Sequence, residues 1–280
     1  MGTFEIPFGD MADLTERARN HVTGKPAFKY ALLYFTGLNP WHSYSELRSS
    51  AEHSKSTSLL SHLFGSSHIA SDGRTIAITP SINPDAGDDD SDNQTVLNTH
   101  IQKQYSISIV LTVRSILLPA LETLLLEHRV PRAALESLCL HSTIVPDDRE
   151  CLFGYALWFG FEYNFGAAIH LLCPQVEHIV RVKLQEASVN TSHVDQDGIN
   201  NEKGLSALMD FPEIIDVLGE DIYFELKSIF TDTLGGNLRN EVAHGLLDDS
   251  SSLSGNTVYA WWIILKLVVE SCINNKQPDQ

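Results

Sequence analysis

The sequence predicts a mainly α-helical protein, and three observations lead to this fold class. Apolar residues recur at the three- and four-residue spacing of helices over most of the chain, above all after residue 95. Runs rich in β-prone residues are short and concentrated near residues 68–79. The hydrophobic fraction of 43 % and the charged fraction of 20 % are those of a globular protein. A chain of 280 residues can form one large or two ordinary domains.

Residues 1–82 are predicted to form a small mixed region of helices and one β-hairpin. Two β-prone runs flank Asp72-Gly73, and this dipeptide tolerates the positive φ angles of a two-residue hairpin turn. The hairpin is therefore expected near residues 68–79. The helical periodicity that precedes it covers residues 10–22, 26–38 and 45–54.

Residues 83–94 are predicted to be an acidic linker or loop, because the segment around them combines Pro, Gly and five Asp residues in "SINPDAGDDDSDNQ". Acidic loops can hold calcium, but the spacing of an EF-hand is absent from the sequence.

Residues 95–275 are predicted to form the main helical domain. One long helix kinked at Pro119, or two helices, would cover residues 95–129. A second long stretch should be kinked or split at Pro174. A double Gly at 235–236 suits a helix end. The complete set of helices expected in this domain is 95–129, 132–142, 147–187, 216–236, 237–247 and 256–274, with a polar loop over 190–204.

Charge and composition narrow the class of protein. The formal net charge of −17 disfavours tight, sequence-blind binding to a polyanion. The four cysteines lie far apart without a CxxC pair, which is typical of reduced thiols in a cytosolic protein. The longest apolar runs are broken by charges, Arg114 and Glu122 in one and Lys266 and Glu270 in the other. We therefore expect a cytoplasmic protein without signal peptide or membrane span.

Common motifs of cofactor and metal chemistry are missing from the sequence. There is no HExxH or HxxxH pair, no GxxxxGK[ST], no GxGxxG after a strand and no GxSxG elbow. The prediction is accordingly no metal and no cofactor.

A polar row interrupts the apolar segment around Pro174. His170, Glu177 and Arg181 fall at i, i+7 and i+11 on one helical face, with Gln175 on a neighbouring face. Buried polar groups need partners. The row is either a solvated face beside the core or the lining of a cleft; in the second case these four residues would bind substrate.

The stretch "NLRNEVAHGLL" groups Arg239, Asn240 and His244 in an otherwise apolar helix. Asn240 and His244 are four residues apart, so they could hydrogen-bond and fix the imidazole tautomer. Arg239 lies about 140° of helix rotation from His244, but a long guanidinium can reach the same cleft. Gly245 either admits another backbone or ends the helix.

This grouping resembles the RNxxxH signature of the HEPN superfamily, whose members are helical bundles and often metal-independent ribonucleases. The segment "EYNFGAAIHLLCPQVEHIVR" together with "LGGNLRNEVAHGLL" is similar to one little-characterised HEPN-type family marked by a C-terminal RNxxxHG. The resemblance covers about residues 150–270 and is faint before residue 95.

The resemblance implies a HEPN-like helical bundle that pairs with a second copy to form a composite cleft for RNA. His244 would act as general base or acid, Arg239 would hold the scissile phosphate, and Asn240 would orient His244 or the phosphate. RNA would be cut through its 2′-hydroxyl without a metal, leaving a 2′,3′-cyclic phosphate.

Two alternatives remain open at the level of the sequence. Many HEPN domains are inactive, and the same dimer could be a scaffold that binds a partner protein or a nucleotide. The acidic charge and the lack of a basic, aromatic RNA platform favour this reading. In the third interpretation the motif is structural, and His244 and Arg239 are buried in intramolecular hydrogen bonds.

Overall fold

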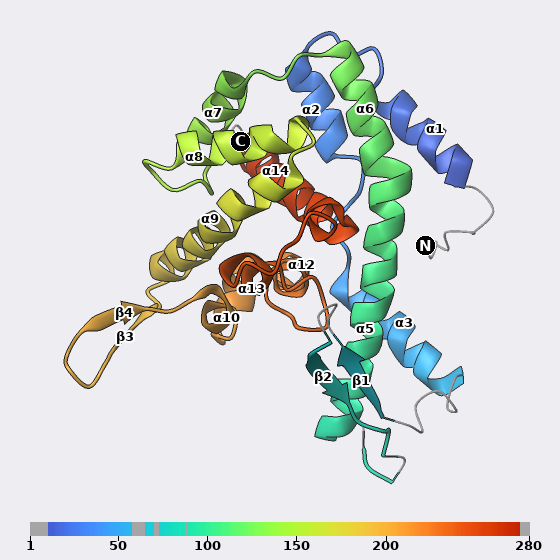
Figure 1. The fold of residues 1–280 in the computed structure, drawn as a ribbon, viewed down its shortest axis with the longest axis vertical. Helices are drawn as coiled ribbons and strands as arrows, with labels where there is room; N and C mark the ends of the chain where they lie inside the picture. The colour runs from blue at the N-terminus through green and yellow to red at the C-terminus, as the bar shows by residue number, and fades with distance from the viewer. Residues whose placement is uncertain (1–10, 58–64, 70–72, 84, 88, 275–280) are drawn as a thin grey trace, which may run out of the picture. The chain divides into compact units, whose positions relative to one another are not determined.

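The computed structural model describes residues 11–57, 65–69, 73–83, 85–87 and 89–274 (Figure 1). It is 65 % helical and 6 % strand, which confirms the predicted mainly α-helical class. The chain divides into two compact units that are discontinuous in sequence. The first comprises the described parts of 1–40, 109–172 and 253–280, and the second those of 41–108 and 173–252. The boundaries predicted near residues 82 and 95 do not coincide with this division, since both fall inside the second unit.

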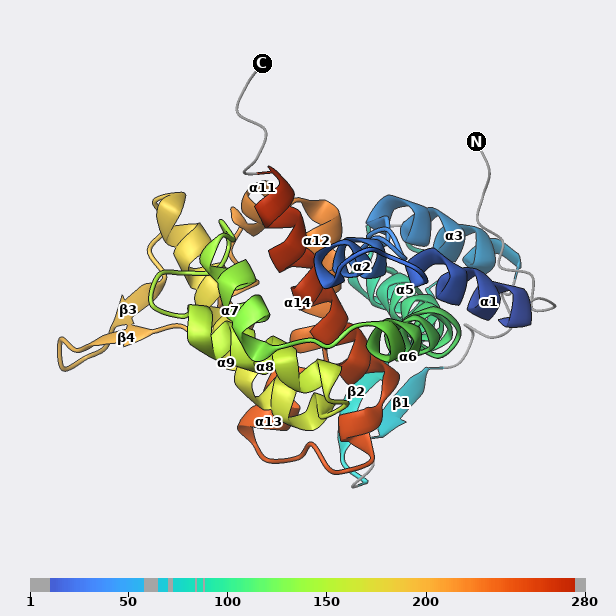
Figure 2. The ribbon, with the colours of Figure 1, turned by 90° about the horizontal axis from the view of Figure 1, so that it is seen from above.

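The first unit is organised around its C-terminal helix α14 (Gly255–Asn274), which packs against helices α2, α7 and α8 (Figure 2). Trp261 and Trp262 of α14 are almost completely buried. Their indole nitrogens donate hydrogen bonds to the backbone oxygens of Leu157 at 2.9 Å and Phe35 at 3.2 Å. The surrounding helices are α1 (Met11–Val22), α2 (Phe28–Thr36), α6 (Leu118–Glu127), α7 (Arg132–Leu140) and α8 (Glu150–Phe161).

The segment predicted as one kinked helix or two is a continuous helical run. It consists of α5 (Ser91–Thr112), a π-helical segment η1 (Val113–Leu117) and α6. Pro119 cannot donate to the carbonyl of Ser115, four residues earlier, which leaves this oxygen without its helical partner. The hydroxyl of Thr15 donates to it instead at 3.0 Å. The irregularity therefore takes the form of a π-helical turn just before the proline.

Of the two alternatives predicted for Pro174, a kink or a split, the split does not occur. Pro174 lies inside the continuous helix α9 (Phe165–Glu186). The chain instead breaks between α8 and α9, where Tyr163 has a positive φ of 57°. The side-chain oxygen of Asn164 accepts from the amide of Ala167 at 3.2 Å and so caps the new helix.

The second unit carries the predicted β-hairpin. Strands β1 (Ser66–Ile69) and β2 (Thr75–Thr79) pair in antiparallel fashion, which confirms a hairpin near 68–79. Residues 70–72, which lie between the two strands, are outside the described residues. Of the predicted turn Asp72-Gly73, residue 72 lies outside the described residues, and Gly73 has a φ of +87°.

The predicted linker 83–94 extends too far, because α5 begins at Ser91. Residues 84 and 88 of this segment lie outside the described residues. The side chain of Asp90 accepts from the amides of Asp92 and Asn93 at 3.1 and 3.2 Å, as a helix cap does. Asn93 is 3 % exposed and bonds the backbone of Asn83. The acidic segment is thus attached to the second unit by its own polar side chains.

The loop predicted over 190–204 contains a second hairpin, formed by β3 (Ser192–Val194) and β4 (Asn200–Glu202). Both strands are polar and mostly exposed, so the alternation that marks a half-buried strand is absent. The carboxylate of Asp195 closes the turn by accepting from the amides of Asp197 and Ile199 and from the side chain of Asn201, at 3.0, 2.9 and 2.9 Å. These hydrogen bonds hold the pKa of Asp195 below its ordinary value.

The second unit contains four further helices. Helix α3 (Tyr44–Thr57) precedes the first hairpin, whereas α10 (Leu205–Leu208), α11 (Ile214–Leu218) and α12 (Glu220–Phe230) come after the second hairpin. Helix α12 carries a buried carboxylate, Glu225, whose side chain is 0 % exposed. It accepts from the backbone amide of His42 at 2.7 Å and from the Tyr105 hydroxyl at 2.9 Å, and lies 3.0 Å from His42 Nδ1. This polar cluster joins three distant segments of the unit.

Two helical stretches, Ser91–Glu127 and Gly255–Ile273, are long and apolar enough to cross a membrane by length and composition. Of their most apolar windows, 44 % and 72 % respectively are buried inside the protein. Core helices of soluble proteins meet the same criteria, so these stretches are compatible with a soluble protein and assign no membrane to it.

Candidate functional site

The Arg-Asn-x-x-x-His segment forms the short helix α13 (Leu238–Ala243) of the second unit. It follows α12 through Gly235 and Gly236, where a Cβ atom would lie 2.0 Å from the Ser228 oxygen and 2.6 Å from the Ile229 oxygen. Only glycine permits this approach of the two backbones. Leu238, which is 2 % exposed, anchors α13 in the core.

His244 is the residue at which α13 ends, and Gly245 turns the chain away with a φ of +65°. Of the two roles considered for Gly245, the structure shows the helix stop. The side chain of His244 is exposed and has no hydrogen-bond partner among the described residues. The imidazole is therefore accessible from solvent, as a proton-transfer group must be.

The predicted bond between the side chains of Asn240 and His244 is absent from the described structure. The Asn240 amide nitrogen donates instead to the side-chain oxygen of Asn237 at 2.9 Å. Asn237 adopts a left-handed conformation, with φ 45°, at the start of α13, and α13 ends before His244 completes a further turn. Asn240 and His244 remain linked through the backbone, where the His244 amide donates to the Asn240 carbonyl at 3.0 Å.

Arg239 reaches towards helix α9, and its side chain is 31 % exposed. One guanidinium nitrogen lies 3.5 Å from Oε2 of Glu177, and the other lies 3.5 Å from the side-chain oxygen of Asn240. Glu177 is thus the carboxylate that faces the motif arginine. The predicted polar row and the predicted motif meet at this ion pair.

Glu177 is held by two shorter contacts as well. Its Oε2 accepts from the backbone amide of Leu205 at 2.9 Å, and its Oε1 accepts from Arg181 at 2.9 Å. Arg181 also donates to the backbone oxygen of Lys203 at 2.8 Å and lies 3.0 Å from the carboxylate of Glu202. These contacts connect α9 to the end of the second hairpin.

The other two members of the predicted row have separate surroundings. His170 belongs to the first unit, is exposed, and its Nδ1 lies 2.8 Å from the backbone oxygen of Gly166. Gln175 is 6 % exposed, and its buried Oε1 has no hydrogen-bond partner in the described part of the chain. Within the described part of the second unit, the Gln175 side chain forms no hydrogen bond with Arg239, Asn240 or His244.

Sequence reasoning missed the backbone at residues 203–205 as part of this site. The Lys203 carbonyl and the Leu205 amide fix Arg181 and Glu177, and Gly204 lies against the Arg239 guanidinium. The letters "EKGL" match no binding motif, so the sequence held no signal for this role.

The local charges nearly balance. Arg181 and Arg239 face the carboxylates of Glu177 and Glu202, while the Lys203 ammonium lies 4.3 Å from the centroid of the Phe211 ring. Nearby, burial raises the pKa of the Cys173 thiol to about 12, against an opposite effect of Arg239. Within the described ranges, no group of three His, Cys, Asp or Glu residues is placed to hold a metal ion.

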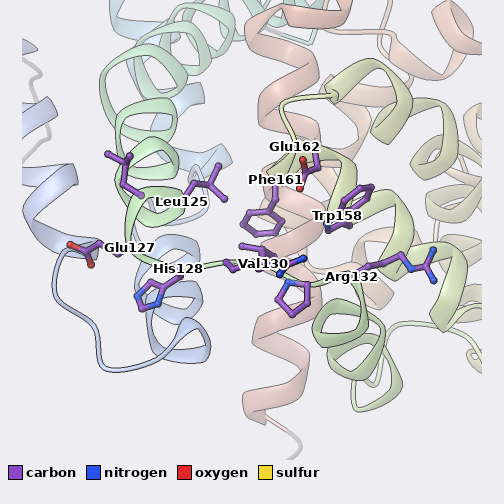
Figure 3. A pocket seen from close by; sticks show the side chains of 11 residues that line it. Leu125, Glu127, His128, Val130, Arg132, Trp158, Phe161 and Glu162 are labelled. Atoms are coloured by element: carbon purple, nitrogen blue, oxygen red, sulfur yellow. The ribbon is translucent and has the colours of Figure 1, made fainter.

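A separate hollow of about 610 Å³ lies in the first unit between the end of α6 and helix α8 (Figure 3). Leu125 and Val130 line it together with Trp158 and Phe161, and its charged groups are of both signs. Nε of Arg132, whose side chain is 56 % exposed, lies 2.9 Å from the Glu136 carboxylate.

No family model, no curated protein and no solved structure matches this chain. The functional argument therefore depends on the motif and on the geometry around it.

Proposed function

We propose that the protein is a metal-independent endoribonuclease of the HEPN type, with Arg239 and His244 as its principal residues. The observation that carries this proposal is the exposure of His244, which is free of hydrogen bonds among the described residues and lies five positions from a partly exposed Arg239. A purely structural motif would bury these side chains in hydrogen bonds. The accessible imidazole argues for a chemical role.

In the proposed reaction the ribose 2′-oxygen attacks the adjacent phosphorus as the 2′-hydroxyl proton leaves. The bond between phosphorus and the 5′-oxygen breaks, and this oxygen takes up a proton. His244 serves as the base or the acid in these transfers, because imidazole can do both near neutral pH. Arg239 binds the phosphate and stabilises the additional charge of the transition state, for which its planar fork is suited.

The proposal includes a homodimer, in which two copies of α13 contribute to one RNA cleft, and a cytoplasmic location. Asn240 has a positioning role within it. Its side chain joins Arg239 to Asn237, so it acts on the arginine rather than on the His244 ring.

A non-catalytic scaffold that binds a partner protein or a nucleotide is the second candidate. The ion pair between Arg239 and Glu177 favours it, because it partly neutralises the guanidinium before any phosphate arrives. The net charge of −17 also favours the scaffold, because it disfavours binding of RNA.

Cleavage of a mixed structured and single-stranded RNA in EDTA tests the proposal. The wild type is compared with Arg239→Ala and His244→Ala, and with His193→Ala, which removes an exposed histidine of the second hairpin as a matched control. We expect wild type and His193→Ala to cut RNA, to spare DNA and to leave 2′,3′-cyclic phosphates. Both motif variants should lose at least about a hundredfold in rate.

Equal silence of all four proteins at high concentration would reject the nuclease. Elution of the same proteins as dimers would then support the scaffold. A cleavage rate of His244→Ala equal to that of the wild type would reject the assigned base or acid.

A further inference from the structure

We propose that Glu177 is a resting partner of Arg239: the two side chains pair in the absence of RNA, and the RNA phosphate must displace Glu177 before Arg239 can act. This inference concerns regulation of the motif site and rests on the proposed ribonuclease function. It follows from the distances of the contacts around Glu177, from the exposure of the Arg239 side chain, and from the position of Gly204 beside the Arg239 guanidinium.

Glu177 keeps its position without Arg239. Its two contacts of 2.9 Å, to the Leu205 amide and to Arg181, are hydrogen bonds, whereas Arg239 approaches only to 3.5 Å. Arg181 is 13 % exposed and is also bonded to the Lys203 carbonyl. The Glu177 carboxylate is therefore held by hydrogen bonds that do not involve Arg239, and Arg239 is its most distant partner.

Arg239 is also more accessible than Arg181. Its side chain is 31 % exposed, compared with 13 % for Arg181. A long side chain with one distant ionic contact can exchange this contact for a phosphate without disturbing the hydrogen bonds behind it. The exchange costs the ion pair with Glu177 and gains a charge-assisted contact with phosphate.

Gly204 makes room for the resting position. A Cβ atom at Gly204 would lie 2.8 Å from the guanidinium nitrogen that faces Glu177. The Gly204 backbone has a φ of −76°, which alanine also adopts. Gly204→Ala should therefore push the flexible end of Arg239 away from Glu177 while leaving every charge in place.

The test measures binding of a short 2′-O-methyl RNA, which lacks the attacking hydroxyl and cannot be cut. Glu177→Gln removes the resting charge, and Gly204→Ala disfavours the resting position sterically. Glu202→Gln is the matched control, since it removes one negative charge from the same network at a residue that contacts Arg181 and not Arg239. Each variant is also made in an Arg239→Ala background.

We expect Glu177→Gln and Gly204→Ala to tighten binding about two- to fivefold, the range typical of partly exposed ion pairs. Glu202→Gln should change it less, and the effects of Glu177→Gln and Gly204→Ala should vanish without Arg239. Equal tightening by Glu177→Gln and Glu202→Gln would overturn the inference, because general charge would then explain both.

The outcomes separate this inference from the proposed function. A wild type that cuts RNA but binds no differently from Glu177→Gln keeps the nuclease and refutes the resting pair. A wild type that never cuts RNA, yet shows the expected pattern of binding, refutes the nuclease and keeps the resting pair. A wild type that neither binds nor cuts RNA overturns both.

Discussion

Removal of one hydroxyl from the buried cluster at Glu225 should destabilise the second unit measurably. In Tyr105→Phe the ring stays, together with its edge-to-face contacts with His42 and Phe224 at 5.0 Å. The lost interaction is the 2.9 Å hydrogen bond to a carboxylate that is 0 % exposed. Hydrogen bonds to charged groups contribute about 1.5–3 kcal/mol, so the free energy of opening this unit should fall by that amount.

Hydrogen exchange of the α12 amides is the appropriate assay, because it reports on this unit even if the two units unfold separately. Tyr30→Phe is the control: it removes the same hydroxyl from a side chain that is 42 % exposed, and should change stability by less than about 0.5 kcal/mol. Equal protection of α12 in both variants would refute the reasoning that the Glu225 cluster holds its segments together.

Three further predictions concern packing, thiol reactivity and the second hairpin. Gly160→Ala should unfold the first unit at clearly lower urea concentration, because the added Cβ would lie 2.1 Å from the Trp261 ring; a normal midpoint would contradict this packing. At pH 8 iodoacetamide should label the exposed Cys151 well before Cys173, whose pKa is raised to about 12, and mass spectrometry of the native protein can show the order. The pKa of Asp195 is lowered, so its ionised carboxylate stabilises the second hairpin above the ordinary pKa, and this stabilisation is lost as pH falls through the lowered pKa. When each exchange rate is divided by the intrinsic rate at that pH, the amides of residues 192–202 should lose protection in acid, whereas Asp195→Ala should show low protection at every pH; wild-type protection that does not change with pH would contradict this.

The helices were predictable from the sequence because their signal is local. Apolar periodicity fixes which face of a segment is buried, and most expected helices are present within a few residues of their predicted bounds. The positions of the breaks depend on distant partners. Pro119 is accommodated in a continuous helical run because Thr15, a hundred residues away, bonds the carbonyl of Ser115 that the proline leaves free.

The second hairpin was not predicted, because its sequence carries no strand signal. Its strands bury little apolar surface, so no alternation marks them, and the turn depends on one carboxylate with three hydrogen-bond donors. A polar segment with Asp, Asn and Gly is typical of a loop or of such a hairpin. Composition alone could not separate the two.

The Arg-Asn-x-x-x-His pattern can be seen in the sequence, but most of the contacts that surround it in the fold cannot be predicted from the sequence. The i, i+4 relation between Glu177 and Arg181 is local and correctly places them together. The expected contact of Asn240 with His244 failed because it assumed a helix longer than the six residues of α13. The contact of Arg239 with Glu177 joins residues that are 62 positions apart, and no spacing rule applies over such a distance.

The local arrangement also bears on why the proposed nuclease would need two copies of the chain. One terminal nitrogen of Arg181 donates to Glu177 and to the Lys203 carbonyl, and Nε of Arg181 lies 3.0 Å from the Glu202 carboxylate. The Lys203 ammonium lies over the Phe211 ring. Arg239 is then the cation of this group best placed for a phosphate, and it carries a competing carboxylate beside it. A single, partly neutralised arginine on a chain of net charge −17 would bind RNA weakly and lose it readily in salt. In the proposed dimer, a second Arg239 would face the same phosphodiester, and each of the two arginines would have to leave its own Glu177 to bind it.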